Sequence, residues 1–569
     1  MNVSSGDRRL LFGYGPLVAM IAAFLLMAVL VPTVAPEHDV ANVTSGAPSE
    51  AGPAVASGVV AASGGAGSAN SVGAGLRGSA PPGANGLPVT GQTGPCAGQA
   101  QQVPGDPYSP PCTAFQGNNG HATSRGVSAD TITIAYRVPA DPVQNYQQAI
   151  EQLASKYGKT QYLDTTADVT RTLNDLVTYF NTHFQFYGRK LKLVQYQGQG
   201  QLAQEILGGG QAAANADGIR VAQQLNAFAD ISALSQPYAE ALSSQRVVNI
   251  GAPYLSQQWF DARAPYAWSL EPDCTELSEF YAEAAAKGIL GHPAAYAGGA
   301  LQGKPRRIGL IAPDNAEYQQ CVAAGEKRLA SQGLHVSDTI SYSLDLGSLS
   351  SQAASIVSRL KADGITSVAC ACDPILPIFL TAKADQQAYV PEWLVMGTAL
   401  TDYDPIAQLY DQKEWSHAFG GTALGAQQPF GSSYGYFAAK AADPGAEPAH
   451  VVDLLYYQLY LLAVGVQEAG PALTAGSFMQ GMLAYPGGSG PAGIWRFGPG
   501  EFTPQRAGKF VWWDPNRASI VDGAPGSYVD ASPYYRLGQI PTGPAPVFPN
   551  GVQTPSSGNS GVTSPPGGS

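Results

Sequence analysis

The sequence predicts an α/β protein built of two doubly wound parallel-sheet lobes with a hinge, plus an N-terminal hydrophobic helix and disordered tethers. Three observations lead to this prediction. Strand-like and helix-like segments alternate along the middle of the chain, the alternation stops and starts again, and Gly and Pro gather towards the two ends. Repeated β-α units imply parallel strands with helices on both faces of each sheet.

The composition bounds the class of protein. The 569 residues carry 30 Lys and Arg against 42 Asp and Glu, a net charge of −12. An acidic chain without a run of Lys and Arg lacks the basic face that nucleic-acid binding needs, so nucleic acid is not expected as a partner. Apolar residues make up 44% of the chain, which is enough for a large core.

The first 35 residues predict a membrane anchor or a signal peptide. Arg8 and Arg9 precede residues 10–35, which contain no charged side chain. About 20 apolar residues span a bilayer, and the two arginines favour a cytoplasmic N-terminus. We expect a cell-membrane anchor with an extracytoplasmic globular part. The alternative is cleavage after the small residues 33–35 and secretion.

Residues 36–125 and 541–569 predict disordered segments. The first is rich in Gly, Pro, Ala and Ser and has no Phe, Tyr or Trp up to residue 107, and the second carries no charge. Such segments bury too little apolar surface to offset the entropy of ordering them. The globular part is therefore expected at 126–540.

Two runs of alternation make up that globular part. In the first run, alternating or buried apolar segments predict strands, and a three- and four-residue apolar spacing predicts helices. The strands are expected at 131–136, 191–196, 229–234 and 247–250, and the helices at 169–184 and 218–228. In the second run, the strands are expected at 306–312, 335–343, 366–372 and 392–397, and the helices at 316–332 and 348–363.

A further helix is expected at 453–470. Its apolar residues cover most of its sides, which is typical of a buried helix. Asp453 and Gln458 interrupt the apolar run, so it is shorter than a membrane span needs. We therefore expect a core helix rather than a second span.

The six cysteines fit an exported protein with disulfides, although their pairing stays open. They are Cys96, Cys112, Cys274, Cys321, Cys370 and Cys372. The first two flank a Pro-rich stretch and could close a local loop. Metal binding by the last two is the other interpretation, because residues two apart on a strand share a face. No His lies near them in the sequence, and no metal or cofactor is expected.

Several segments together resemble a known family. Residues 184–194, which contain Gly-Arg-Lys between a helix and a strand, resemble a junction of the branched-chain amino-acid (leucine-binding) proteins. These are type I periplasmic-binding-like solute receptors of ABC transporters. Residues 126–134 resemble their opening strand, 307–318 their strand and acidic loop ending in Tyr, and 493–498 a late return strand. The order and spacing of these segments carry the resemblance.

The resemblance implies a domain organisation and a function. Lobe 1 would comprise 126–270 with 420–487, and lobe 2 would comprise 271–419 with 488–540, joined by three crossings. The protein would be a monomeric receptor, not an enzyme, that captures an amino acid or related small polar solute for an ABC permease. The alternative is an envelope binding or sensor module that does not serve transport.

Candidate ligand contacts follow from a rule that needs no family. In open α/β sheets, ligands sit outside the carboxyl ends of the strands, where helix N-termini present free N–H groups. The residues in those loops are Ser235, Gln236, Ala252, Pro253, Tyr254, Asp314, Asn315, Glu317, Tyr318, Asp373 and Thr398. Ser235 could instead cap a helix, Asp314 could be a turn residue and Tyr318 a packing residue.

The resemblance assigns roles to two of these residues and shows one departure. Ser235 matches the family's serine for a ligand carboxylate, and Tyr318 matches its aromatic residue from lobe 2. The Gly-Pro expected before the serine is replaced here by residues 231–234, Ile-Ser-Ala-Leu. The departure bears on amino-acid specificity more than on the fold.

A serine hydrolase is the remaining alternative. Residues 431–435 satisfy the Gly-x-Ser-x-Gly pattern, with His450 and Asp453 downstream. The nucleophile elbow needs a buried strand directly before the serine and an acid before the His. Residues 426–430 are not a strand pattern and the order of acid and His is reversed, so the hydrolase is disfavoured.

Overall fold

The structure is a computed structural model that describes residues 96, 99–140, 164–206, 208–344 and 348–556. The predicted anchor at 1–35 and the segment 36–95 lie outside the described residues. Within the described part of the chain, no helix is long and apolar enough to cross a membrane.

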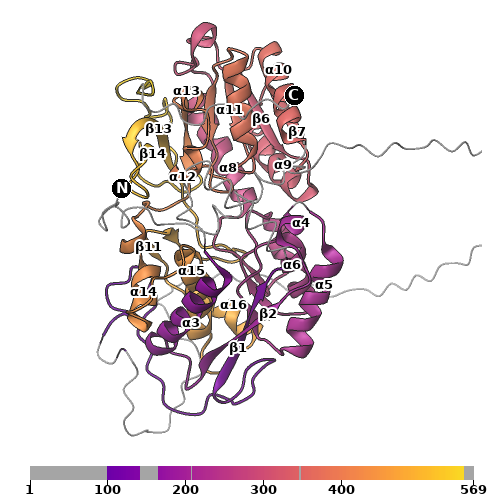
Figure 1. The fold of residues 1–569 in the computed structure, drawn as a ribbon, viewed down its shortest axis with the longest axis vertical. Helices are drawn as coiled ribbons and strands as arrows, with labels where there is room; N and C mark the ends of the chain where they lie inside the picture. The colour runs from indigo at the N-terminus through magenta and orange to yellow at the C-terminus, as the bar shows by residue number, and fades with distance from the viewer. Residues whose placement is uncertain (1–95, 97–98, 141–163, 207, 345–347, 557–569) are drawn as a thin grey trace, which may run out of the picture. The chain divides into compact units, whose positions relative to one another are not determined.

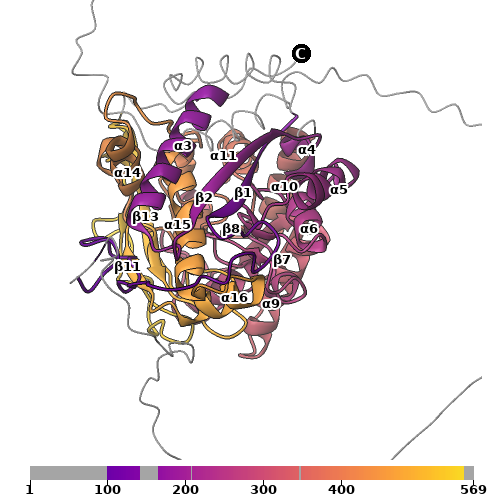
Figure 2. The same cartoon turned by 90° about the horizontal axis from the view of Figure 1, so that it is seen from below.

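The first sheet has five strands in the order β2-β1-β3-β4-β5, and all neighbours are parallel. The strands are β1 (Thr131–Val138), β2 (Lys190–Gln197), β3 (Ala229–Asp230), β4 (Val248–Ile250) and β5 (Ala267–Trp268). Figure 2 shows α3 (Thr166–His183), α14 (Tyr434–Ala442) and α15 (Val452–Ala469) on one side of β1 and β2, and α5 (Gln211–Ile219) and α6 (Gln236–Ser244) on the other.

Local sequence explains how this sheet is covered. A capping box between Thr165 and Asp168 starts α3 by satisfying free N–H groups at its first turn. Leu173, Leu176 and Phe180 then recur on one face and are fully buried. The helix predicted at 453–470 is α15, which is buried on most sides within the core of the first sheet. It is therefore a core helix, as predicted.

The second sheet has seven strands in the order β14-β13-β10-β9-β8-β6-β7. Its strands are β6 (Ile308–Pro313), β7 (Asp338–Tyr342), β8 (Ser367–Cys370), β9 (Glu392–Val395), β10 (Ala418–Thr422), β13 (Lys509–Ala518) and β14 (Pro525–Asp530). The five strands from β10 to β7 run parallel, whereas β13 and β14 pair antiparallel at one edge. Figure 1 shows β6 and β7 beside α9 and α10, away from β1 and β2. The predicted α/β class with two doubly wound, mainly parallel sheets is confirmed.

The remaining elements connect and cover these sheets. The other helices are α4 (Leu202–Ile206), η3 (Arg220–Gln224), α7 (Gln257–Asp261), α8 (Cys274–Ala284), η4 (Ala285–Ile289), η5 (Gly299–Leu301), α9 (Ala316–Ala330), α10 (Leu349–Ala362), α11 (Leu376–Gln386), α12 (Asp404–Ala407), α13 (Gln412–Trp415), η6 (Phe430–Ser432) and α16 (Ala475–Ala484). A small antiparallel pair is formed by β11 (Gly488–Gly490) and β12 (Gly493–Trp495).

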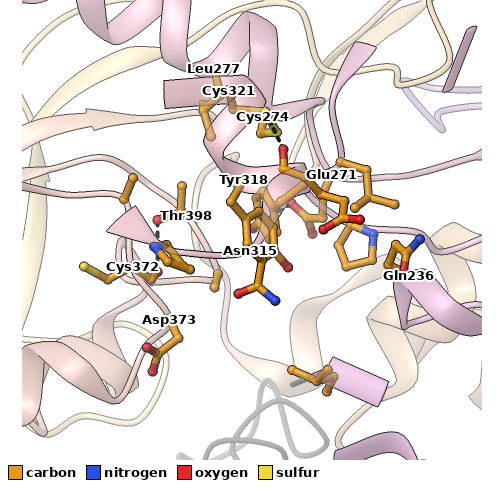
Figure 3. Close-up of a pocket in the computed structure, with 18 of the residues that line it drawn as sticks. Gln236, Glu271, Cys274, Leu277, Asn315, Tyr318, Cys321, Cys372, Asp373 and Thr398 are labelled. Atoms are coloured by element: carbon orange, nitrogen blue, oxygen red, sulfur yellow. Dashed lines mark hydrogen bonds between the residues drawn. A yellow bond between two sulfur atoms is a disulfide. The ribbon is translucent and has the colours of Figure 1, made fainter. Parts of the chain in front are cut away.

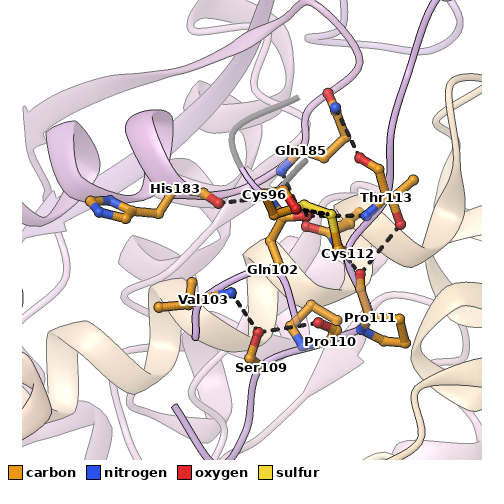
Figure 4. The surroundings of a disulfide bond; sticks show 11 residues. Cys96, Gln102, Val103, Ser109, Pro110, Pro111, Cys112, Thr113, His183 and Gln185 are labelled. Carbon is orange, nitrogen blue, oxygen red and sulfur yellow. Dashed lines mark hydrogen bonds between the residues drawn. A yellow bond between two sulfur atoms is a disulfide. The ribbon is translucent and has the colours of Figure 1, made fainter. Parts of the chain in front are cut away.

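Residues 99–125 correct the prediction of a tether that reaches residue 125. A disulfide joins Cys96 to Cys112, and Gln102 donates from Nε2 to the carbonyl of His183 at 2.8 Å (Figure 4). Tyr108 is 1% exposed, packs on Trp495 with ring centroids 4.4 Å apart, and donates to the carbonyl of Gly493. One buried aromatic side chain and a covalent loop thus order a segment whose composition indicated disorder.

The predicted tail and lobe boundaries are corrected in the same way. Val547 and Phe548, within the predicted tail 541–569, are buried against the second sheet. Residues 420–422 belong to β10 of the second sheet, although they were predicted in lobe 1. Residues 488–502 were predicted in lobe 2, yet Trp495, Phe497 and Phe502 lie in the core of the first sheet. Strand pairing decides the boundary at 420–422, and buried apolar side chains decide the other two.

Candidate functional site

A cavity of about 240 Å³ lies where loops from both sheets converge (Figure 3). From the first sheet, the loop after β3 contributes Ser235 and the loop after β4 contributes Tyr254. From the second sheet, the first turn of α9, which follows β6, contributes Tyr318, and the loops after β8 and β9 contribute Asp373 and Thr398. The cavity therefore lies at the carboxyl ends of parallel strands, where the rule for open α/β sheets places ligands.

The structure brings most of the predicted site residues together at this cavity. Those that line it are Ser235, Gln236, Pro253, Tyr254, Asn315, Glu317, Tyr318, Asp373 and Thr398. Ala252 and Asp314 do not line it. Ala252 is fully buried in the core of the first sheet, whereas Asp314 is exposed and its N–H donates to the carbonyl of Tyr342 at 2.8 Å. The sequence therefore predicted which loops border the cavity, but not which of their side chains point into it.

Ser235 has a different partner from the one that the family resemblance implies. It is 2% exposed and precedes α6, but its side chain makes no capping hydrogen bond there. Its hydroxyl donates to the carboxylate of Glu205. Pro237 stands in the first turn of α6 and removes one of the N–H groups that an anion could use.

Glu205 belongs to a buried ionic network on the first-sheet side. Arg137, at 2% exposure, donates to both carboxylate oxygens of Glu205 at 2.7 and 2.6 Å and to Asp217 at 3.1 Å. Its guanidinium also lies 3.6 Å from the centre of the Tyr238 ring, a cation–π contact. Burial alone would lower the pKa of Arg137, but its hydrogen bonds to Glu205 and the charge of that carboxylate raise it. In this network one permanent cation is shared by the two carboxylates.

On the second-sheet side, Asp373 has a structural task beside the cavity. Its carboxylate accepts from the hydroxyl of Tyr342 at 2.5 Å and from the N–H groups of Ile375 and Leu376 at 2.7 and 3.2 Å. It thereby satisfies free N–H groups where α11 begins. Thr398 donates from its hydroxyl to the carbonyl of Cys372 at 3.2 Å.

Two further lining residues were missed by the sequence reasoning. Glu271 lies at the crossing from β5 to α8 and accepts from the hydroxyl of Tyr254 at 3.2 Å. Burial and repulsion from Asp402 raise the pKa of Glu271 to about 7. Gln458, on α15, lines the cavity at 1% exposure. Gln458 interrupts the apolar pattern of its helix, and this was the only feature of the sequence that could have marked it as a site residue. Glu271 lies outside every predicted strand-end loop, so nothing in the sequence marked it.

The pairing of the cysteines, which the sequence left open, is now given. The bonds are Cys96–Cys112, Cys274–Cys321 and Cys370–Cys372, so all six cysteines are oxidised. The Cys274–Cys321 bond joins α8 to α9. Both of these cysteines line the cavity, and so does Cys372. The metal interpretation of Cys370 and Cys372 therefore gives way to a disulfide. Among the described residues, no cluster of three or more His, Cys, Asp or Glu is arranged to hold a metal ion.

The residues of the hydrolase alternative have structural partners. Ser433 caps α14 by accepting from the N–H of Tyr436 at 3.2 Å, and η6 rather than a strand precedes it. His450 pairs with Asp164 at 2.6 Å. The strand–serine–helix elbow that the mechanism needs is thus missing at Ser433.

Comparisons with known proteins concern the fold. No protein-family model matches the sequence. No curated protein is similar to it. Solved structures do match, among them substrate-binding proteins of ABC transporters, the class that the sequence resembles.

Three of these structures illustrate the similarity. A substrate-binding protein from Aeropyrum pernix is 13% identical with a TM-score of 0.49, covering 72% of this chain and 96% of its own. A solute-binding protein from R. palustris in complex with 4-hydroxybenzoate is 11% identical with a TM-score of 0.49, covering 72% and 97%. The branched-chain amino-acid protein LivJ from Streptococcus pneumoniae, in complex with isoleucine, is 12% identical with a TM-score of 0.46, covering 70% and 100%.

Proposed function

We propose that this chain is an extracytoplasmic receptor that captures a small polar solute between its two sheets for an ABC importer. The observation that carries the proposal is the cavity lined by strand-end loops of both sheets. A solute that contacts both sets of loops stabilises the arrangement in which they face each other. Occupancy is then signalled to a permease by that arrangement.

The size of the cavity supports a small ligand. Its volume of about 240 Å³ lies just below the range of about 300–1,000 Å³ for small-molecule pockets. Aromatic and aliphatic side chains supply most of its lining, and a few polar groups converge on it. That combination is typical of a site for one small solute.

The disulfides support an extracytoplasmic location. Three disulfides form and persist in an oxidising compartment, outside the cytoplasm. Anchoring by residues 1–35 is part of the proposal, with secretion as its alternative. Proteolysis of intact cells, followed by detection of residues 99–556, tests the location.

Isothermal titration against amino acids, short amides, hydroxybenzoates and sugars tests binding. We expect heat of binding and a raised Tm with at least one small polar solute. Asn315→Ala, in the cavity, should weaken that binding, whereas Asn174→Ala, exposed on α3, should leave it unchanged. No heat from any solute, together with an unchanged Tm, would contradict the proposal.

Uptake measurements distinguish import from a binding module without transport. Cells lacking this chain should lose uptake of the bound solute if the chain serves a permease. Normal uptake in those cells, with binding intact in vitro, would favour the module instead.

A further inference from the structure

The charged side chains that line the cavity are all acidic. The lining includes four carboxylates, those of Glu205, Glu271, Glu317 and Asp373. Among the described residues that line the cavity, none is Lys, Arg or His. A ligand therefore meets acidic side chains on both sides and no basic side chain.

Two of the four carboxylates, those of Glu205 and Asp373, have strong donors within the protein, whereas Glu271 and Glu317 have no ion pair among the described residues. Arg137 neutralises Glu205, and three donors satisfy Asp373. Glu271 receives one hydroxyl hydrogen bond, from Tyr254, and its carboxylate has no basic partner among the described residues. A half-buried carboxylate without a basic partner is costly, so a cation that joins Glu271 relieves that cost.

The surroundings of Glu271 add to the negative potential. Asp402 is 2% exposed and its Oδ1 has no hydrogen-bond partner among the described residues, while Oδ2 accepts from Thr422. Its charge raises the pKa of Glu271. Tyr254, Tyr281 and Tyr318 line the same cavity and present rings that attract cations.

A second, independent observation points to a neutral polar group on the ligand. Gln458 is 1% exposed and lines the cavity, yet its Nε2 has no hydrogen-bond partner among the described residues. A buried amide N–H without a partner costs about 1–3 kcal/mol. A carbonyl or hydroxyl oxygen of the ligand would satisfy it.

The rest of the lining suits an apolar body. It includes Leu234, Leu255, Leu270, Leu277 and Met396. A second apolar space of about 80 Å³ beneath α8 and α9 shares Tyr281, Val322 and Met396 with the cavity. An aliphatic side chain could extend in that direction.

The groups that would hold a carboxylate are weakened here. The hydroxyl of Ser235 is donated to Glu205, and Pro237 removes an N–H from the first turn of α6. A carboxylate ligand would therefore lie beside Glu271 with no basic side chain to compensate the repulsion.

We propose that the solute is a monocation with an apolar body, a neutral carbonyl or hydroxyl group, and no carboxylate. An amide or alcohol derivative of an apolar amine has this chemistry. The inference rests on the proposed function and names the substrate class of the same cavity.

Titration of the full-length chain with five probes of one carbon skeleton tests the inference. The probes are leucinamide (cation and amide), 3-methylbutylamine (cation alone), 4-methylpentanamide (amide alone), leucine (zwitterion) and 4-methylpentanoate (anion). We expect leucinamide to bind at least about tenfold more tightly than leucine, a difference of about 1.4 kcal/mol. The anion should bind most weakly.

Two variants assign the two contacts. Glu271→Gln should weaken leucinamide and 3-methylbutylamine about tenfold or more and leave 4-methylpentanamide unchanged. Gln458→Met should weaken the two amides and leave 3-methylbutylamine unchanged. Glu279→Gln, on α8 and outside the cavity lining, is the matched control and should change none of them.

The outcomes separate the inference from the proposed function. If leucine or 4-methylpentanoate binds as tightly as leucinamide, the inference is overturned and the receptor function stands. The inference is also overturned, and the receptor function stands, if only neutral or anionic solutes bind among the amino acids, amides, hydroxybenzoates and sugars tested above. If no solute of either panel binds and Tm is unchanged, both are overturned. The ranking of probes on the unmodified chain decides the matter even if a variant fails to fold.

Discussion

Two acidic groups border the same cavity and differ in how the protein compensates them. On the first-sheet side, Glu205 and Asp217 share the buried guanidinium of Arg137. At the crossing between the sheets, Glu271 has a tyrosine hydroxyl and a repelling neighbour, Asp402. In the first arrangement the protein itself supplies the cation. In the second it supplies none, and we propose that a ligand does. Removing the charged group should therefore lower the free energy of unfolding at Arg137 and raise it at Glu271.

Arg137→Met has the largest expected effect. It leaves Glu205 and Asp217, both at most 1% exposed, without their cation. Breaking a buried pair in this way costs about 3–5 kcal/mol, which urea denaturation measures directly. Arg359→Met is the control: its ion pairs are solvent-exposed, so the change should be at most about 1 kcal/mol. Equal effects of the two substitutions would remove the distinction between the two acidic groups.

Ser235→Ala has an intermediate expected effect. The hydroxyl donates to the carboxylate of Glu205, which Arg137 also contacts, and its loss should lower the free energy of unfolding by about 1.5 kcal/mol. Solute affinity should change little, because this hydroxyl is directed to Glu205. Ser355→Ala, exposed on α10, is the control for stability. A large loss of affinity with unchanged stability would restore Ser235 as a direct ligand contact.

Glu271→Gln should act in the opposite direction at pH 8. Removing the charge ends its repulsion with Asp402, so the free energy of unfolding should rise by up to about 1 kcal/mol, given that the carboxyl is only half-buried. Urea denaturation without solute measures this gain. A loss comparable to that of Arg137→Met would show that Glu271 is structurally matched after all.

The pH dependence gives the smallest and most specific signal. The folded pKa of Glu271, about 7, lies above its ordinary value of 4.5, so its contribution favours folding at low pH. That contribution is lost as the pH rises from about 4.5 through 7. The groups facing Glu271 are Tyr254 and Asp402, and Asp402 is in turn influenced by Lys509.

Stability profiles of the unmodified chain and of Glu271→Gln should therefore coincide near pH 4.5 and separate by pH 8. Asp402 has a raised pKa of about 6 and is coupled to Glu271 by repulsion, so the difference between the profiles measures the Glu271 charge together with that repulsion. Parallel profiles across the whole range would contradict the assignment.

Much of the fold could be predicted because many strands and helices have a clear local pattern of apolar residues. The strand at 131–136, the helix at 169–184 and the buried helix at 453–470 appear as β1, α3 and α15, since each has a clear apolar period. The segment 99–125 could not be predicted, because its order depends on Tyr108 meeting Trp495 from the far end of the chain.

The candidate site was likewise predictable only in part. The strand-end rule located the loops of Ser235, Tyr254, Tyr318, Asp373 and Thr398, because strand ends are visible in the sequence. It could not show that Ser235 and Asp373 are bonded to groups of the protein itself, nor that Glu271 lines the cavity without a basic partner among the described residues. Those facts depend on which side chains the crossings between the sheets bring within contact.

The sequence by itself thus determined the α/β class, the two runs of strands and helices, and the loops in which a ligand site had to lie. Apolar periodicity and strand ends are local properties of the chain. The tertiary structure alone decided the pairing of the cysteines, the packing of residues 99–125 and 541–556, and the charge around the cavity. These depend on contacts between residues far apart in the chain, and the compensation of a buried charge is set by such contacts.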